Sequence, residues 1–380
     1  MRTFILLLCV ELNSFGAERT YTIVGTGQTK CYDDRREITP PKPGQPFYGQ
    51  DAQHPGPAPS YKDNGNGAIA DLNTGLMWVK ARGEKVTWQD AVAGAKSCRA
   101  GGFTDWRMPT IKELYSLINF NGGFDMRAGA KRSTPYLDTK YFEFKYGDES
   151  KGERGIDCQD WSATEYIRTT MDNNPTVFGV NFADGRIKGY PKTTRRGAHR
   201  LFVRYVRGNP LYGKNDFRDN GDGTITDRAT GLMWQKADSG KGLNWEQALA
   251  YAASLKGGWR LPNAKELQSI VDYTRIPAIS PVFQCSTLPD GEHPFYWTST
   301  THLDGPRDRQ GVAAVYVCFG RALGWMSFPP GAGQPRLIDV HGAGAQRSDP
   351  KSGDPADYPH GRGPQGDVIR IYNYVRCVRD

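Results

Sequence analysis

The pattern of apolar and polar positions predicts the same short series of elements twice along the chain. Leu114, Leu117 and Ile118 fall at i, i+3 and i+4, which is the spacing of one buried helix face. Residues 202–208 instead alternate apolar and charged side chains, as a half-buried strand does. The turn sequence DNGDG at 219–223 predicts a β-hairpin. We therefore expect an α+β fold with antiparallel strands.

Four helix starts share one capping pattern, in which a hydroxyl or amide side chain precedes an acid or amide by three residues. The four pairs are Thr87–Asp90, Thr110–Glu113, Asn244–Gln247 and Asn263–Glu266. Such side chains accept hydrogen bonds from backbone amides that the first helical turn leaves without partners. The pattern predicts two helices in the first half of the chain and two in the second.

These elements recur because the chain repeats itself. Residues 63–80 and 219–236 are identical at twelve of eighteen positions. Four more blocks recur in the same order, at 87–95 and 244–252, 106–120 and 259–273, 161–164 and 297–300, and 202–208 and 374–380. A period this long indicates a duplicated domain, since solenoid repeats run about 20 to 50 residues. We predict a Pro-rich arm at 18–60, module 1 at 61–208 and module 2 at 209–380.

The repeated motifs resemble a known bacterial family. GDGTITD, TGLMWQK, WRLPNAKELQSIVDY, YWTST and YVRCV together look like the Lcl C-terminal domain family, named for the C-terminal domain of Legionella collagen-like protein. The resemblance covers about residues 61–380 as two copies. It implies tandem, loop-rich, C-type-lectin-like modules, each with two helices and antiparallel strands. It also implies an exported protein and, as in the namesake, adhesion to sulfated polysaccharide.

Two departures limit what the resemblance carries. The EPN, QPD and WND motifs of calcium-dependent lectins are absent, so we do not expect that mode of sugar binding. The WRxPT-then-helix element is also similar to one in formylglycine-generating enzymes, but their paired copper-binding cysteines have no counterpart here. Fold therefore transfers better than function.

Composition and charge place the chain among folded proteins with acidic partners. Its 380 residues include 45 Gly and 25 Pro, and 12% are aromatic, which argues against both disorder and a helical bundle. The net charge of +8 favours partners such as anionic polysaccharide. The charge is spread along the chain, so nucleic-acid binding is not expected. No stretch after the N-terminus reaches the roughly 18 apolar residues of a membrane span.

The N-terminus predicts export. Arg2, the apolar stretch 3–10 and the mostly small residues of 14–17 form the pattern of a cleavable signal peptide at 1–17. We expect a secreted, periplasmic or cell-surface protein. An even number of remaining cysteines then predicts up to three disulfides. Besides Cys31, the candidates are Cys98, Cys158, Cys285, Cys318 and Cys377. The lectin-like resemblance leaves open a Cys98–Cys377 bridge across the modules or a local pair such as Cys98–Cys158.

The densest basic region predicts a binding site for an acidic ligand. Its candidate residues are Lys188, Tyr190, Lys192, Arg195, Arg196 and Arg200, with His199 among them. Guanidinium groups bind sulfate or carboxylate through two parallel hydrogen bonds. Arg204 and Arg207 follow in the same region, but they repeat at Arg376 and Arg379, which indicates a structural role.

Metal binding and catalysis find less support. DNGDG as a calcium loop requires an oxygen ligand where the two copies have Lys62 and Arg218. The polar segment 341–367 contains a possible ligand set, which is His341, Asp349, Asp354, Asp357 and His360. We expect a packed surface loop there, with no metal and no cofactor. No nucleophile elbow, metalloprotease motif or nucleotide loop occurs. We therefore expect a non-enzymatic binding protein, with an envelope scaffold that pairs with protein and a hydrolase-type enzyme as alternatives.

Overall fold

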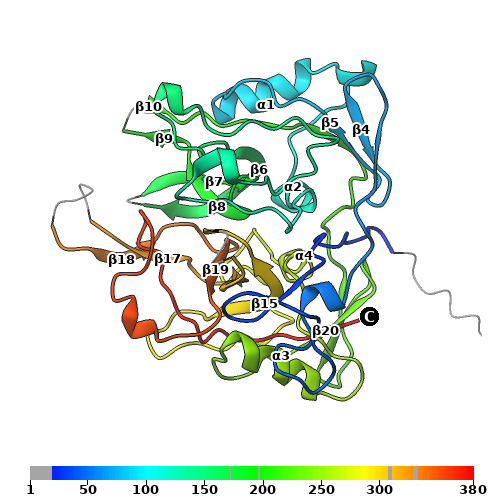
Figure 1. Cartoon of the computed structure of the whole chain (residues 1–380). Helices are drawn as coiled ribbons and strands as arrows, with labels where there is room; N and C mark the ends of the chain where they lie inside the picture. The colour runs from blue at the N-terminus through cyan, green and yellow to red at the C-terminus, as the bar shows by residue number, and fades with distance from the viewer. Residues whose placement is uncertain (1–18, 172, 196, 307–309, 328–332) are drawn as a thin grey trace, which may run out of the picture.

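Each half of the chain contains two helices and short antiparallel strands in the same order (Figure 1). The computed structural model describes residues 19–171, 173–195, 197–306, 310–327 and 333–380, so the predicted signal peptide at 1–17 lies outside the described residues. The elements up to residue 208 are β1 (Cys31–Tyr32), β2 (Glu37–Ile38), β3 (Tyr61–Asp63), β4 (Ala68–Asp71), β5 (Leu76–Val79), α1 (Trp88–Ser97), α2 (Ile111–Ser116), β6 (Asp160–Thr170), β7 (Asn174–Asn181), β8 (Arg186–Pro191), β9 (Thr193–Thr194), β10 (Gly197–Ala198) and β11 (Val206–Gly208). Those after it are β12 (Phe217–Asp219), β13 (Thr224–Asp227), β14 (Leu232–Gln235), α3 (Trp245–Ser254), α4 (Ala264–Ser269), β15 (Phe295–His302), β16 (Ala313–Cys318), β17 (Leu323–Met326), β18 (Arg336–Asp339), β19 (Gln346–Pro350) and β20 (Val378–Arg379).

The predicted caps begin all four helices. The capping side chains are those of Thr87, Thr110, Asn244 and Asn263. Ahead of α2, Arg107 donates to both carboxylate oxygens of Glu113, at 2.7 and 2.5 Å, and this carboxylate also accepts from Thr110 N at 2.8 Å. Arg260 and Glu266 repeat the pair ahead of α4, at 2.7 and 2.8 Å. The repeated WRxP motif therefore fixes where α2 and α4 start.

The closing strand of each half pairs with the strand that carries TGLMW. β11 lies beside β5, and β20 lies beside β14. The repeated arginines of these segments are structural, as predicted. The buried Arg204 guanidinium donates to the backbone carbonyls of Val79, Lys80 and Glu143, and Arg376 makes the equivalent bonds in the second half.

The two halves share one six-stranded antiparallel sheet. Its strand order is β15-β16-β19-β8-β7-β6. Read from β6, the three strands of the first half come first, and their repeats in the second half follow in the reverse order. The halves meet where Ile187 of β8 faces Gln346 of β19. Each of these residues lies four positions before a Pro-Lys pair, at 191–192 and 350–351, so the two are equivalent in the repeat. A pseudo-two-fold axis therefore passes between them, and the fold is an internal dimer of the duplicated domain.

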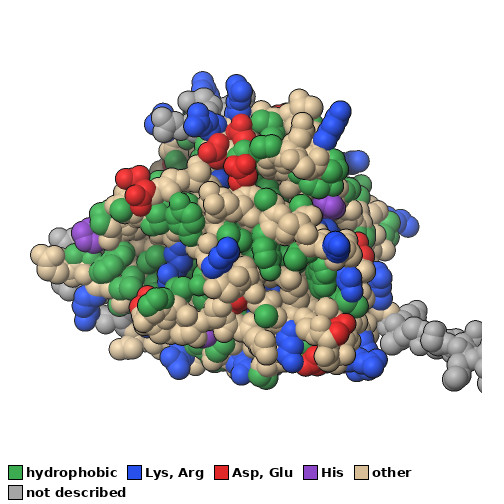
Figure 2. All heavy atoms as spheres, turned by 90° about the horizontal axis from the view of Figure 1, so that it is seen from below, with side chains coloured by type: hydrophobic (Ala, Val, Ile, Leu, Met, Phe, Trp, Pro, Cys, Tyr) green, Lys and Arg blue, Asp and Glu red, His purple; other side chains and the backbone are tan. Residues whose placement is uncertain are grey.

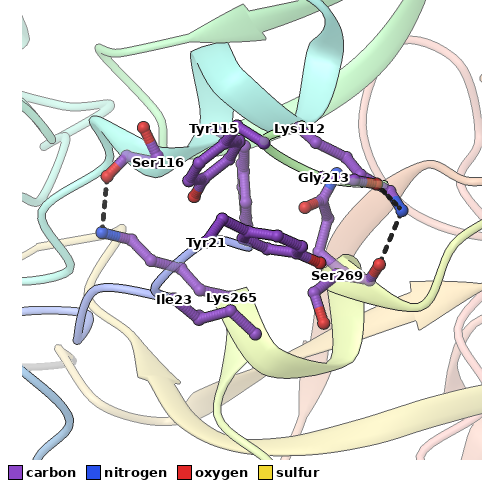
Figure 3. Close-up of a pocket in the computed structure, with 10 residues that line it drawn as sticks. Tyr21, Ile23, Lys112, Tyr115, Ser116, Gly213, Lys265 and Ser269 are labelled. Carbon is purple, nitrogen blue, oxygen red and sulfur yellow. Dashed lines mark hydrogen bonds between the residues drawn. The ribbon is translucent and has the colours of Figure 1, made fainter. Parts of the chain in front are cut away.

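The same axis relates α2 and α4 through two crossed lysines (Figure 3). Lys112 Nζ donates to Ser269 O at 2.6 Å, and its repeat Lys265 donates to Ser116 O at 2.7 Å. Each serine is the last residue of the other half's helix, where carbonyl groups have no partner within the helix. Burial lowers the pKa of Lys265 to about 7 and that of Lys112 to about 8.

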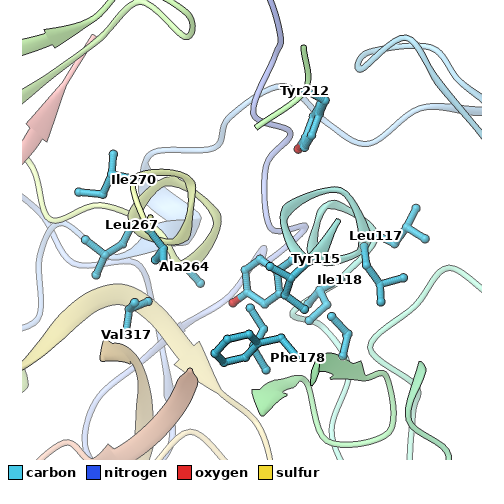
Figure 4. Packing of buried hydrophobic residues seen from close by; sticks show 14 of the residues in the cluster. Tyr115, Leu117, Ile118, Phe178, Tyr212, Ala264, Leu267, Ile270 and Val317 are labelled. Carbon is cyan, nitrogen blue, oxygen red and sulfur yellow. The ribbon is translucent and has the colours of Figure 1, made fainter. Parts of the chain in front are cut away.

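One hydrophobic cluster runs through both halves (Figure 4). Leu114, Leu117 and Ile118 are at most 2% exposed, which confirms the predicted apolar stripe. Leu267 from α4 and Phe178 from β7 belong to the same cluster. The core therefore joins the halves and does not divide at the repeat boundary.

The arm packs against the second half of the chain. Thr20 N donates to Ala229 O at 2.9 Å, and the rings of Tyr21 and Tyr212 lie 4.9 Å apart. Further along, Asp51 is buried and accepts hydrogen bonds from Thr26 and Thr300. Thr26 O also accepts from Phe120 N at 2.8 Å, so residues 19–54 contact both halves of the chain.

Two sequence-based expectations are wrong. All six cysteines among the described residues are free, so neither the Cys98–Cys377 nor the Cys98–Cys158 bridge exists. The candidates lie in different surroundings: Cys158 packs with Phe124 and Phe202 in the first half, whereas Cys318 and Cys377 belong to an apolar cluster of the second half and Cys285 Sγ lies 3.3 Å from Arg376 Nη2.

The segment 341–367 is likewise not a surface loop throughout. Residues 346–350 form β19 in the middle of the shared sheet, with His341 2% and Asp349 0% exposed. The hydrophobic pattern hid this strand because its side chains are mostly polar and charged.

Candidate functional site

A charged cleft of about 850 Å³ lies where β8 and β19 meet, with both halves contributing to its walls. Eight basic side chains and five carboxylates line it. The basic residues are Lys85, Lys151, Arg154, Arg186, Lys188, Arg200, Arg347 and Arg362, and the acidic ones are Glu153, Asp157, Asp184, Asp304 and Asp367. On the face shown in Figure 2, the Lys and Arg side chains are dispersed among other side chains. In the cleft, by contrast, both signs of charge line one hollow.

Strand alternation places the cations of the floor. Because Ile187 and Gln346 face each other and belong to the core side, their neighbours Lys188 and Arg347 point to the opposite side of the sheet. Lys188 and Arg347 occupy equivalent positions in the repeat, so they lie on either side of the pseudo-two-fold axis. Arg186 lies two residues before Lys188 and shares its side.

Ion pairs hold these cations. Arg347 binds Asp367, which also accepts from His341 Nε2 at 2.8 Å. Burial alone would raise the pKa of Asp367, but Arg347 and His341 hold it well below its usual range. Lys188 Nζ lies 3.6 Å from its partner, Asp184 Oδ2. Burial lowers the pKa of Lys188 to about 8.

Two of the three histidines that line the cleft, His302 and His341, are neutral at physiological pH. Burial lowers the pKa of His341 and that of His302 to about 4. His302 Nε2 lies 2.9 Å from Asp184 O, and its ring stacks on Tyr136 with centroids 5.5 Å apart. Both rings therefore serve as neutral hydrogen-bonding groups in the wall.

Several buried polar atoms of the cleft residues have no protein partner. The donors are Tyr190 Oη and Arg347 Nη1, and the acceptors are Asp184 Oδ1 and one ring nitrogen, His341 Nδ1. Leaving such an atom unpaired costs about 1–3 kcal/mol. Residues of the cleft wall thus carry both donor and acceptor atoms that make no hydrogen bond within the described part of the protein.

The predicted ligand-binding residues divide between the cleft and its surroundings. Lys188, Tyr190 and Arg200 line the cleft. Lys192 turns away, with its ammonium 2.7 Å from Glu165 and 3.9 Å from the centre of a Trp88 ring. Arg195 is exposed beside β9, and Arg196 lies outside the described residues.

Sequence reasoning missed Arg186, Arg347 and Asp367. The signal for Arg347 was present, because YPK at 190–192 and DPK at 349–351 begin three residues after Ile187 and Gln346. That repeat maps Lys188 onto Arg347. Asp367 carries no comparable signal, since it reaches the cleft from a loop.

The possible metal ligands of 341–367 do not gather. Within the described ranges, no group of three or more His, Cys, Asp or Glu side chains is placed to hold a metal ion. His341 binds Asp367, Asp349 accepts from the backbone at 370 and 371, and His360 lies against Trp325. These residues instead organise the chain around β19.

Two equivalent halves that share a sheet, a core and a cleft define a duplicated-domain protein. The model of the Lcl C-terminal domain matches residues 67–207 and 223–327. The chain therefore belongs to the Lcl C-terminal domain family, as two tandem copies. No curated protein and no solved structure matches the chain. The C-type-lectin-like assignment accordingly stays a prediction. None of the helices in the described part of the chain has the length and apolar character to cross a membrane.

Proposed function

We propose that this chain is an exported, non-enzymatic binding protein that takes an acidic saccharide segment into the cleft on its pseudo-two-fold axis. Membership of the Lcl C-terminal domain family supports a surface or binding role. The choice of ligand is supported by the polar atoms of the cleft. Lys188, Arg347 and Tyr190 suit carboxylate or sulfate oxygens, whereas Asp184 and His341 accept from hydroxyl groups.

One observation carries this proposal: unpaired donors and unpaired acceptors lie together in one buried wall. A simple anion satisfies the donors and leaves Asp184 Oδ1 and His341 Nδ1 without partners. A polyhydroxylated acid satisfies both kinds. The exposed Arg200 at the rim adds attraction that salt screens.

The test is binding of the full chain to uronate- and sulfate-bearing oligosaccharides on a glycan array, followed by titration calorimetry. Lys188→Gln and Tyr190→Phe should each weaken binding about tenfold, as expected when a charge-assisted or buried hydrogen bond is lost. The matched control is Lys256→Gln, an exposed lysine outside the cleft. A chelator should change nothing.

Equal affinities of the wild type and Lys188→Gln would contradict the proposal, as would retention that salt does not alter. Turnover of a bound glycan would show an enzyme instead. Failure to bind any acidic glycan, together with recovery of one stoichiometric protein partner, would favour the scaffold.

A further inference from the structure

The two outer strands of the shared sheet are treated differently by the rest of the chain. β6 and β15 are equivalent and lie at opposite edges. All eight residues of β15 are buried, whereas Ala163, Glu165 and Ile167 of β6 are exposed. The difference arises because the arm covers β15 and does not cover β6.

Three arm residues cover the edge of β15. Gln28 pairs its side-chain amide with the main chain of Thr301, accepting from the backbone N and donating to the backbone O, both at 2.9 Å. The buried carboxylate of Asp51 accepts from the hydroxyl of Thr300. Phe47 lies 6.2 Å, centre to centre, from the fully buried Trp245.

A lysine completes this contact. Lys351 Nζ lies 3.8 Å from the centre of a Trp245 ring. It donates to Tyr32 O, Asp33 O and the hydroxyl of Thr301, at 3.3, 3.0 and 2.8 Å. The arm is therefore bound through its backbone, an amide, an aromatic ring and a carboxylate.

Module 1 repeats the receiving side of this contact without the arm. Trp88 donates to Ser162 O at 3.0 Å, as Trp245 donates to Thr298 O at 2.8 Å. Thr164 is the repeat of Thr300. Its hydroxyl accepts a hydrogen bond from the backbone N of residue 111, just as the hydroxyl of Thr300 accepts one from the backbone N of residue 264.

Lys192 repeats Lys351 over the Trp88 ring. In place of the neutral Thr301, however, it meets Glu165, whose side chain is 52% exposed. Beside Thr164 the surface opens into a groove of about 600 Å³ that also contains Tyr212 and Tyr273. No described side chain takes the place of Gln28 on the main chain of Glu165.

We propose that the exposed edge of β6, with Trp88, Thr164 and Lys192, docks an extended segment of a partner protein that carries a side-chain amide, an aromatic ring and a carboxylate. The occupant follows from the duplicate face, where a segment of this chemistry is already bound. An unpaired edge strand accepts such a segment through its free backbone groups. This site is separate from the saccharide cleft.

The probe is a synthetic peptide of residues 24–54, titrated by fluorescence polarisation into the full chain. Glu165→Thr gives module 1 the threonine that module 2 has and releases Lys192 from its ion pair. It should tighten binding about fivefold, because Lys192 can then donate to the peptide backbone as Lys351 donates to Tyr32 O and Asp33 O. Thr164→Val should weaken binding by a similar factor. Glu149→Thr, at an exposed position away from β6, is the matched control and should change nothing.

Three results would overturn this docking site. The first is no binding of the peptide to either the wild type or Glu165→Thr. The second is peptide binding that is abolished by Thr300→Val and unchanged by Glu165→Thr. In that case the peptide binds at β15 in place of the chain's own arm and not at β6. The third is concentration-dependent dimerisation of the chain alone that Thr164→Val removes, which would make a second copy the occupant. Sedimentation velocity of Glu165→Thr without peptide should instead show a monomer.

Discussion

The crossed lysines of the pseudo-two-fold axis make a quantitative prediction about stability. Lys265 is 3% exposed, and its ammonium donates to Ser116 O at 2.7 Å and to Gly25 O at 3.0 Å. Burial lowers its pKa from 10.5 to about 7, although the nearby carboxylates of Asp71 and Asp51 act in the opposite direction. The perturbation is Lys265→Met, which keeps the aliphatic stem and removes the titrating group.

The sign follows from which state binds the proton. Between pH 7 and pH 10.5 the unfolded chain holds a proton on Lys265 that the folded chain has lost. The free energy of unfolding therefore rises with pH, by about 1.4 kcal/mol per unit for one such group. From pH 8 to pH 10 the contribution of Lys265 is roughly 2–3 kcal/mol. Lys265→Met lacks this contribution. The free energy of unfolding of the wild type should therefore rise relative to that of the variant by roughly 2–3 kcal/mol between pH 8 and pH 10.

Urea denaturation followed by tryptophan fluorescence at pH 8, 9 and 10 measures this difference. Lys256→Met, at an exposed position, should give a curve parallel to the wild type. Parallel curves for Lys265→Met as well would refute the reasoning, because they would show that Lys265 does not lose its proton on folding.

Three further predictions concern Gly189, Asp51 and the six cysteines. Gly189→Ala should lower the free energy of unfolding by about 1–3 kcal/mol in urea titrations, since its Cβ would lie 2.5 Å from Thr176 Cγ2 and 2.8 Å from His341 O; an unchanged midpoint would contradict that packing. Burial raises the pKa of Asp51 to about 6, so calorimetry should show the free energy of unfolding of the wild type falling by about 2 kcal/mol relative to that of Asp51→Asn as the pH rises from 4 to 6. Alkylation of the unfolded, unreduced protein should label all six cysteines from Cys31 to Cys377. Any pair of cysteines that mass spectrometry finds unlabelled would show a disulfide and contradict this prediction.

Local signals in the sequence predicted local structure well. The caps at Thr110 and Asn263 and the hairpin at 219–223 depend on residues close in the chain, and all are confirmed. The structural role of Arg204 also followed from its repeat at Arg376.

The relation between the two halves could not be predicted in the same way. β19 has no hydrophobic alternation, because its outward side chains serve the cleft and Gln346 faces the other half. The arm looked like a Pro-rich spacer, although Gln28 and Asp51 bind residues more than two hundred positions away. The cleft depends on this arrangement, so Lys188, Tyr190, His199 and Arg200 were predicted from the basic region, whereas Arg186, Arg347 and Asp367 were not.

Cross-linking across the axis tests most directly whether the duplicated halves share one sheet. Ile187→Cys with Gln346→Cys places two thiols on facing residues, whose Cβ atoms in antiparallel strands lie about 4.5–5.5 Å apart. Mild oxidation should yield a peptide pair joined at 187 and 346. Ile187→Cys with Arg347→Cys puts the second thiol on the opposite side of the sheet and should yield none. Cross-linking of the second pair but not the first would contradict the register that brings Lys188 and Arg347 together.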